Sequence, residues 1–192
     1  MATASRKTSP PTAARKSPAR KAPAGTSRSS AGTDAIALLR ADHQRVSDLY
    51  QQYESTRSAA KKKTLVATIC QELSIHAQVE EEIFYPAVKA ALKDKELVPE
   101  AQVEHATLKE LIAQVKDKEP DGEMFDAKIK VMSEYTKHHV KEEQNEMFPK
   151  ARATKLDMKE LGAQIAARKE ELMANPELME APPVSAAREA VA

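Results

Sequence analysis

The sequence is poor in cysteine, glycine and aromatic residues. A single cysteine, Cys70, among 192 residues excludes an internal disulfide framework and a metal site built from several thiolates. There are 4 glycines, 3 phenylalanines and no tryptophan. No stretch alternates β-branched and polar residues as an exposed strand does, so the composition favours an all-helical protein.

Long apolar runs are also missing. No uninterrupted stretch approaches the roughly 20 apolar residues that a membrane-spanning helix needs, and no apolar segment near Met1 resembles a secretory signal. We therefore expect a soluble, cytoplasmic protein without a membrane partner.

The near-neutral total charge conceals a basic tail on an acidic body. Residues 1–33 carry seven lysines and arginines and no acid, so a net charge of +1 for the chain leaves −6 for residues 34–192. The tail is rich in proline, alanine and serine and is predicted to be disordered. Its nonspecific contacts with nucleic-acid phosphates would involve Arg15, Lys16, Arg20 and Lys21. An inert solubilising extension or a targeting segment remains an alternative.

The sequence pattern of residues 34–192 predicts a series of helices. Capping residues, a Glu-Pro-Asp-Gly breaker and the apolar periodicity predict helices over about 34–57, 59–92, 99–118, 123–151 and 156–174. We expect an up-down-up-down four-helix bundle over 34–152, a further helix within 153–175 and a loose tail over 176–192. Pro86 and Pro149 are expected to kink or end their helices.

Two segments, residues 76–86 and 139–149, are near copies of each other. Each has histidine, glutamate four residues later, and an aromatic residue before proline. Positions i and i+4 share a helix face, so each segment presents an imidazole and a carboxylate together. Each copy is preceded by a helix with one more histidine. The six candidate metal ligands are His43, His76, Glu80, His105, His139 and Glu143.

Taken singly, such a histidine is usually a surface or core residue, and a glutamate run is usually solvated. Helical phase favours the metal interpretation, because His76 and Glu80 fall within an apolar stripe that includes Ile69 and Leu73. Unpaired polar groups in a core would be very costly. One turn before the second-helix and fourth-helix histidines, Glu72 and Tyr135 are candidates to orient the ligands, although Glu72 is equally interpretable as an exposed helix charge. We expect Glu81, Glu82 and Glu142 to be mainly solvated, and His138 either to lie at the surface or to support a ligand from outside the centre.

Nitrogen and carboxylate ligands without thiolate suit iron, manganese or zinc, and two carboxylates able to bridge suit a pair of ions. The Glu-x-x-His pattern of ferritin-like bundles is absent, as is the His-Glu-x-x-His of zinc proteases.

Residues 34–152 resemble the hemerythrin-like, or HHE cation-binding, domains. The resemblance implies two non-heme irons bridged by Glu80 and Glu143, one held by His43 and His76 and the other by His105 and His139. Oxygen-carrying members have a further histidine four residues after the third-helix histidine. That position is Lys109 here, and Ser47 in the repeat, which implies either an open or water-filled position on the iron or a nearby carboxylate in place of the histidine. We expect Lys109 to extend toward solvent, with a catalytic role as the alternative.

These features support a non-heme di-iron protein that binds or senses dioxygen, or another small diatomic molecule, or handles iron. An alternative is a di-iron enzyme that turns over peroxide, oxygen or nitric oxide. A second alternative is a nucleic-acid-associated protein that binds through its basic tail, since the sequence has no helix-turn-helix, zinc finger or aromatic platform for base recognition.

Overall fold

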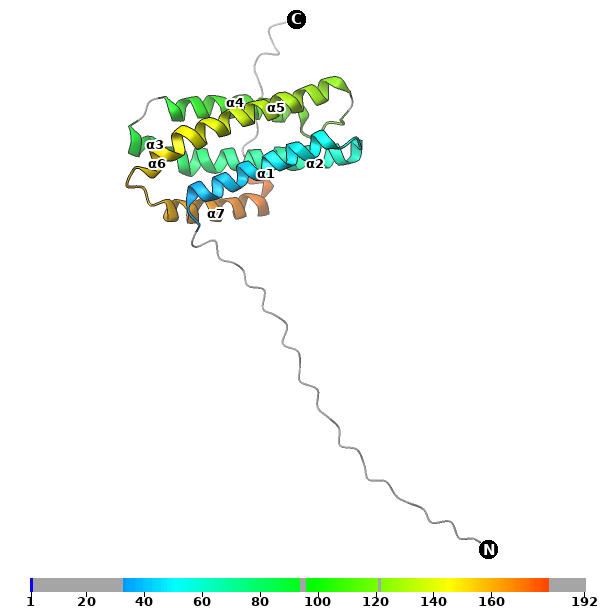
Figure 1. The fold of residues 1–192 in the computed structure, drawn as a ribbon, viewed down its shortest axis with the longest axis horizontal. Coiled ribbons are helices and arrows are strands. Elements are labelled where there is room, and N and C mark those ends of the chain that lie inside the picture. The colour runs from blue at the N-terminus through cyan, green and yellow to red at the C-terminus, as the bar shows by residue number, and fades with distance from the viewer. Residues whose placement is uncertain (2–32, 94–95, 121, 180–192) are drawn as a thin grey trace, which may run out of the picture.

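The structure, a computed structural model, describes residue 1 and residues 33–93, 96–120 and 122–179. Within these ranges every regular element is helical, and four long helical rods lie side by side with a fifth helix against them (Figure 1). The predicted all-α bundle with an additional C-terminal helix is confirmed. The basic tail, apart from its two ends, and residues 180–192 of the C-terminal tail lie outside the described residues.

Six α-helices and two π-helical turns form the rods, and α7 and a 3-10 turn follow them. In chain order the elements are α1 (Ala35–Ser55), α2 (Ala59–Val79), the π turn η1 (Glu80–Phe84), α3 (Tyr85–Leu92), α4 (Leu97–Val115), α5 (Glu123–Glu142), the π turn η2 (Glu143–Met147), α6 (Phe148–Arg152), α7 (Met158–Ala174) and the 3-10 turn η3 (Pro176–Leu178).

Side-chain caps set the starts of three helices. Asp34 accepts a hydrogen bond from the Ala37 backbone N–H at 2.8 Å, and Ser58 accepts one in the same way at the start of α2. Asp157 accepts two backbone N–H groups of α7. These oxygens satisfy donors that the first turn of a helix leaves unpaired, which explains why the predicted helix starts agree closely with the observed ones.

Pro86 and Pro149 do not end their helices. Of the two outcomes expected from the sequence, a kink or a helix end, the helix end is therefore wrong. Ahead of each proline the helix widens into a π turn, in which the Tyr85 N–H donates to the Glu80 carbonyl and the Phe148 N–H donates to the Glu143 carbonyl. A proline clashes with the carbonyl four residues before it, and a wider turn accommodates this conflict. The rods therefore continue as α3 and α6.

The apolar core is divided into two clusters. One, toward α3, α6 and α7, contains Phe84, Tyr85 and Phe148, and the other, toward the opposite end of the rods, contains Tyr50 and Met132. Along each rod the candidate ligands occur between residues of the first cluster and residues of the second. A polar layer thus crosses the bundle between two apolar ones, and it is shielded from solvent at both ends.

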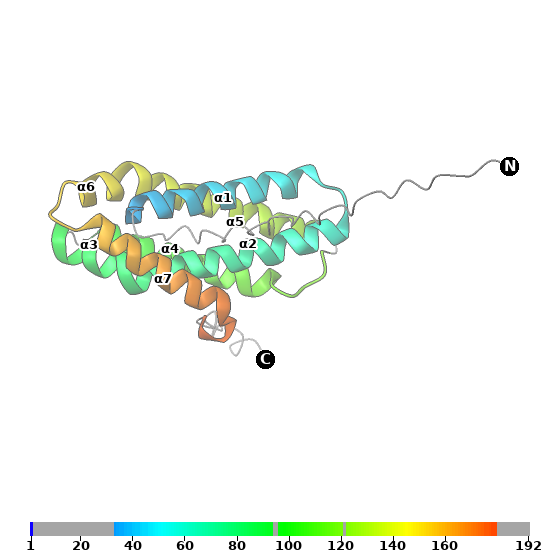
Figure 2. The ribbon, with the colours of Figure 1, turned by 90° about the horizontal axis from the view of Figure 1, so that it is seen from below.

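Helix α7 packs across α1 and α2, on the side away from α4 and α5 (Figures 1 and 2). Its apolar residues Leu161, Ile165 and Leu172 join the first cluster. Gly162 allows close contact, because a Cβ atom there would lie 2.2 Å from the Thr33 carbonyl oxygen. The fifth helix therefore covers one face of the bundle.

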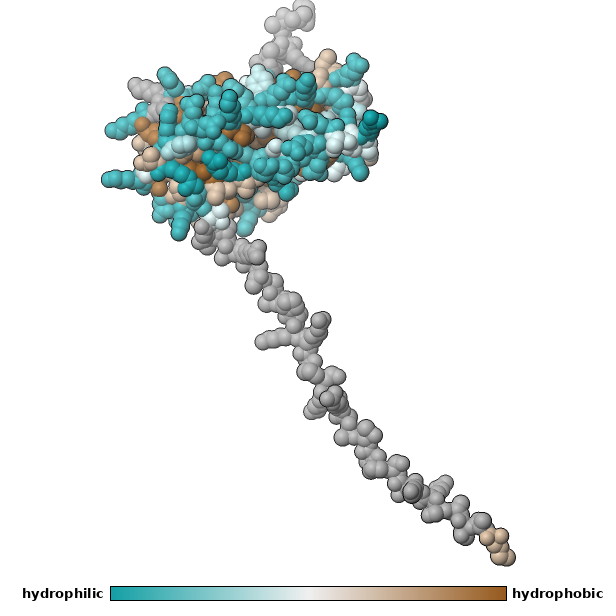
Figure 3. Space-filling model, viewed as in Figure 1, coloured by the Kyte–Doolittle hydropathy of each residue, from teal (hydrophilic) through white to brown (hydrophobic). Residues whose placement is uncertain are grey.

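The visible surface of the helical body is mainly hydrophilic, with small apolar areas between charged side chains (Figure 3). Among the described residues, the helices lack the length and apolar character required to cross a membrane.

Replacing Gly162 by Ala tests the packing of α7. In a helix interior this change normally stabilises by about 1 kcal/mol. Here the new Cβ would meet backbone atoms of Thr33 and Ala35, which cannot move cheaply, so we expect the free energy of unfolding to fall by roughly 1–3 kcal/mol. Urea denaturation measures the change. The exposed Ala167→Gly on the same helix calibrates helix propensity alone, and a more stable Gly162→Ala protein would contradict the close contact.

Candidate metal centre

Four imidazoles meet in the polar layer, one from each long helix. His43 on α1 and His76 on α2 face each other with their Nε2 atoms 3.0 Å apart, and His105 on α4 and His139 on α5 do the same at 3.1 Å. All four side chains are buried. Each helical hairpin thus supplies one pair of imidazoles with the same nitrogen directed inward.

Two carboxylates lie between the imidazole pairs. Glu80 Oε2 is 3.1 Å from His76 Nε2 and 3.5 Å from His105 Nε2. Glu143 Oε2 is 3.2 Å from His43 Nε2 and 3.6 Å from His139 Nε2. Each carboxylate therefore contacts one imidazole of each pair, which is the position of a bridging ligand.

The donor set fits a cation. Glu80 is 0 % exposed and Glu143 is 1 % exposed, and within the described part of the chain Glu80 Oε1 has no hydrogen-bond partner and Glu143 Oε2 has only its contacts with the two imidazoles. Buried carboxylate oxygens without hydrogen-bond donors are stabilised by a nearby positive charge. Potential ligand atoms within 4.8 Å of one another form two groups: His43, His76, Glu80 and Glu143, and Glu80, His105 and His139. The six residues selected from the sequence are thus brought together.

In each helical hairpin, the acidic residue that precedes the first histidine contacts and orients the second histidine. Asp42 Oδ2 lies 3.4 Å from His76 Nδ1, and Glu104 Oε2 lies 2.7 Å from His139 Nδ1. Acceptors at Nδ1 hold its proton there and leave Nε2 free for a metal. This role was not predicted from the sequence, although both residues stand directly before a candidate ligand.

The residue after each carboxylate ligand contacts a histidine of the opposite hairpin. Glu81 Oε1 lies 3.0 Å from His105 Nδ1, and Gln144 Nε2 lies 3.1 Å from His43 Nδ1. The expectation that Glu81 is mainly solvated is therefore wrong, because the carboxylate is half-buried against an imidazole. All four outward nitrogens thus have partners, and the partners follow the internal repeat.

The two residues expected to orient the ligands do not contact them. Glu72 forms an ion pair with Arg45 at 2.5 Å, which is the alternative interpretation of this residue, and Tyr135 is 45 % exposed. One turn of helix separates each from a ligand, but the side chains diverge toward solvent. His138 is 61 % exposed, in agreement with its predicted surface position.

Lys109 does not extend freely into solvent. Its Nζ lies 2.6 Å from Glu81 Oε2, and the side chain is 17 % exposed. Lys109 therefore neutralises the carboxylate that holds His105. The pKa of Glu81 is lowered because the contacts with His105 and Lys109 outweigh its burial.

A tyrosine hydroxyl lies between the two carboxylates. Tyr85 Oη is 2.9 Å from Glu143 Oε1, 3.2 Å from Glu80 Oε2 and 3.2 Å from His105 Nε2. In a regular α-helix Tyr85 would lie about 140° around the axis from Glu80, and the π turn brings it back to the same face. Its repeat counterpart, Phe148, stacks on His43 without a hydroxyl.

The buried ionisable groups at the centre shift one another's pKa values. Burial disfavours the imidazolium of His76, but Glu80 and Asp42 raise its pKa to about 10. Burial dominates at His43 and lowers its pKa. Despite burial, the neighbouring imidazoles hold the pKa of Glu143 far below its usual value. Burial and both carboxylates raise the pKa of Tyr85, which stays protonated. A cation that binds here replaces protons on the imidazoles.

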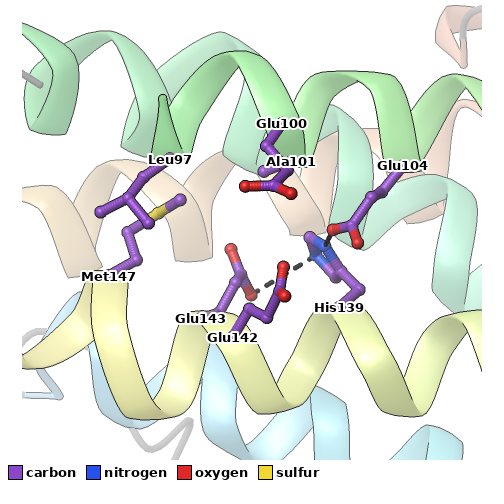
Figure 4. Close-up of a pocket in the computed structure, with 8 residues that line it drawn as sticks. All are labelled: Leu97, Glu100, Ala101, Glu104, His139, Glu142, Glu143 and Met147. Carbon is purple, nitrogen blue, oxygen red and sulfur yellow. Dashed lines mark hydrogen bonds and ion pairs between the residues drawn. The ribbon is translucent and has the colours of Figure 1, made fainter. Parts of the chain in front are cut away.

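A small cavity adjoins all four imidazoles. Its volume is about 10 Å³, the room of one water-sized molecule, and its wall includes apolar side chains of Val46, Leu73 and Leu108. A second, more polar cleft lies beside His139, between α4 on one side and α5 with the following π turn on the other (Figure 4).

Comparison with known proteins agrees with this geometry. The family model of the hemerythrin HHE cation-binding domain matches residues 34–151. The fold is similar to the crystal structure of a hemerythrin HHE cation-binding domain-containing protein from Mycobacterium kansasii, with a TM-score of 0.63 and 22 % identity over 74 % of this chain and 88 % of that one. At this identity the structural likeness concerns the fold alone.

A DNA nickase from Nostoc sp. is 25 % identical over 111 residues. The match includes 58 % of this chain and spans 31 % of the length of the nickase.

Replacing Tyr85 by Phe tests the hydrogen bonds between the carboxylates. In the metal-free protein the Tyr85 hydroxyl is the donor nearest to Glu143 Oε1, and hydrogen bonds to charged groups are worth about 1.5–3 kcal/mol. We expect the free energy of unfolding to fall by roughly that amount, measured by urea denaturation with a chelator present.

The matched control is Tyr50→Phe, which removes a buried hydroxyl that meets Thr136 at 3.3 Å in a neutral contact. This variant is expected to lose less than about 1 kcal/mol. Equal losses in the two variants would show that the Tyr85 hydroxyl has no special role between the carboxylates.

Proposed function

The chain belongs to the hemerythrin HHE cation-binding domain family, and from this premise we propose that it holds two carboxylate-bridged, non-heme iron ions and binds or senses dioxygen or a similar diatomic molecule. The observation that carries the proposal is the arrangement of the two imidazole pairs on either side of two buried carboxylates. His43 and His76 would hold one ion, His105 and His139 the other, and Glu80 and Glu143 would bridge them. When bound, the iron pair would supply exchangeable coordination positions and electrons.

The surroundings of the imidazoles favour a small ligand. The cavity beside them has room for about one water-sized molecule, and its apolar residues suit a weakly polar diatomic better than a larger or charged substrate. Lys109 supports this proposal indirectly. Because it contacts Glu81, the position where oxygen-carrying members of the family have another histidine would not supply a ligand, and a bound ion would keep a position for solvent or a diatomic molecule.

Metal analysis of protein purified from its own source tests the proposal, and we expect about two irons per chain. The reduced protein would then be mixed with air-saturated buffer and afterwards purged with argon. An absorbance spectrum would be recorded after each step. A spectral change that argon reverses supports binding of dioxygen. A protein without iron, or one that does not respond to any diatomic molecule, would contradict the proposal.

Replacing Glu80 or Glu143 by Ala should reduce the iron content to about one ion per chain or less, because a carboxylate shared by both ions is lost. Glu72→Ala is the matched control and should retain the full content, since Glu72 forms an ion pair with Arg45 at the surface of the bundle. Elemental analysis after gel filtration measures the iron. Full loading in both ligand variants would exclude the assigned bridge.

Tyr85 favours a second candidate, an enzyme that turns over peroxide, oxygen or nitric oxide at the same centre. Its hydroxyl contacts His105 Nε2 and both carboxylates, and its raised pKa keeps it protonated as a hydrogen-bond donor beside the centre. Catalytic consumption of substrate by the iron-loaded protein, lost in Tyr85→Phe, would distinguish this enzyme from a reversible binder.

The charge of residues 1–33 favours a further candidate, nonspecific association with nucleic acid. Seven cations without an acid should release counterions from duplex DNA, with log K falling against log salt at a slope no steeper than about −6. Replacing four of these residues by Gln should reduce the slope by roughly 3–4, measured by fluorescence anisotropy. The four residues are Arg15, Lys16, Arg20 and Lys21.

The control variant replaces four exposed lysines of the helical body, Lys130, Lys137, Lys141 and Lys159. Its slope should remain that of the wild type. If both variants lose the same slope, the whole chain binds through its overall charge and the tail has no special part in the interaction.

A further inference from the structure

Outside the buried centre, three side chains of α4 and α5 form a further group of potential metal ligands. His138 Nε2 lies 3.2 Å from Glu142 Oε1 and 3.5 Å from Glu104 Oε1. The three ligand atoms lie within 4.8 Å of one another. We call Glu104, His138 and Glu142 the surface triad. One imidazole and two carboxylates are ligands that a divalent transition metal accepts.

The surface triad is linked to the buried centre. The second oxygen of Glu104, Oε2, contacts His139 Nδ1 at 2.7 Å. Glu104 and Glu142 also line a cleft that has Glu143 and His139 on its wall (Figure 4). Glu143 is 1 % exposed, and in the described part of the chain its Oε2 contacts only the imidazoles of His43 and His139. The cleft therefore joins the surface triad to a buried carboxylate that requires a cation.

The internal repeat shows that this polar face is not a general property of the bundle. The positions of Glu100, His138 and Glu142 correspond in the other hairpin to Leu38, Ile75 and Val79. Ile75 and Val79 are buried, and Leu38 packs against the same cluster under α7. At these three positions the covered face beside His76 is thus apolar and packs under α7, although the counterpart of Glu104 is Asp42, whereas the open face beside His139 has ligand-type residues and lies on the side away from α7 (Figure 1).

The covered face also carries basic residues that neutralise its acids, whereas the open face is mainly acidic. On the covered face Lys169 contacts Asp42, and Arg168 forms an ion pair with Glu82 at 2.7 Å. On the open face the cleft is lined by Glu100, Glu104 and Glu142. A cleft with one sign of charge raises the local concentration of the opposite ion and its association rate. A cation would approach the centre from the open face.

We propose that the surface triad is a docking site for divalent iron on its way to the buried centre. The proposal rests on the proposed function of the centre as an iron site. His138 is 61 % exposed, so water would complete the coordination of an ion held there. With fewer protein ligands and more solvent than the buried centre, the surface triad would hold iron briefly and release it into the cleft.

The test is the rate at which metal-free protein takes up Fe²⁺ without oxygen. Samples are quenched with a chelator at set times, and the iron retained by the protein is measured. His138→Ala and Glu142→Gln should load at least about fivefold more slowly than the wild type, with unchanged final iron content. The matched control is Glu110→Gln, which makes the same charge change at an exposed position of α4.

Loading of both triad variants within about twofold of the Glu110→Gln rate would overturn the docking site. A lower final iron content in both would also overturn it, since these residues would then support the buried centre itself. A wild-type protein that takes up no iron would instead reject the proposed function, so the two failures are distinguishable.

Discussion

Two carboxylates, Glu80 and Glu143, lie at the centre of the bundle almost without solvent contact, and the surrounding structure is organised around their charge. Transfer of an isolated carboxylate from water into a protein interior is very costly. Four imidazoles and the Tyr85 hydroxyl surround the pair, and a second set of residues fixes the imidazoles through their outward nitrogens. The apolar clusters above and below this layer keep water out, so a cation remains the natural counter-charge.

The repeat makes the centre nearly symmetric, but a few substitutions make its halves unequal. His105 is held by the charged Glu81 with Lys109 behind it, whereas His43 is contacted by the neutral Gln144. A tyrosine beside one half corresponds to Phe148 beside the other. A negative partner increases the basicity of an imidazole more than a neutral amide does. The two halves of the candidate centre therefore differ in their electronic environment, although their ligand-type residues are the same.

Helix number, helix ends and the six candidate ligands followed from the sequence because each depends on local rules. Caps such as Asp34 act within one turn, and His76 and Glu80 share a face through the i, i+4 relation. The positions of Tyr85 and of the ligand partners did not follow, because a π turn changes the helical phase and Asp42 and Glu81 contact residues on other helices. Glu72 and Tyr135 show the converse: equivalent places in a repeat do not guarantee contact with a ligand.

The packing of α7 also has a consequence for synthesis of the chain. Among the described α-helices α7 is the last to leave the ribosome, yet it covers Ile75 and Val79 and meets the start of α1 at Gly162. Until about residue 172 has emerged, the apolar face beside His76 lacks the cover of α7, and the first turn of α1 lacks its contact with Gly162. One wall of the candidate metal centre is therefore completed late in synthesis of the described helices, which ties its assembly to the emergence of α7.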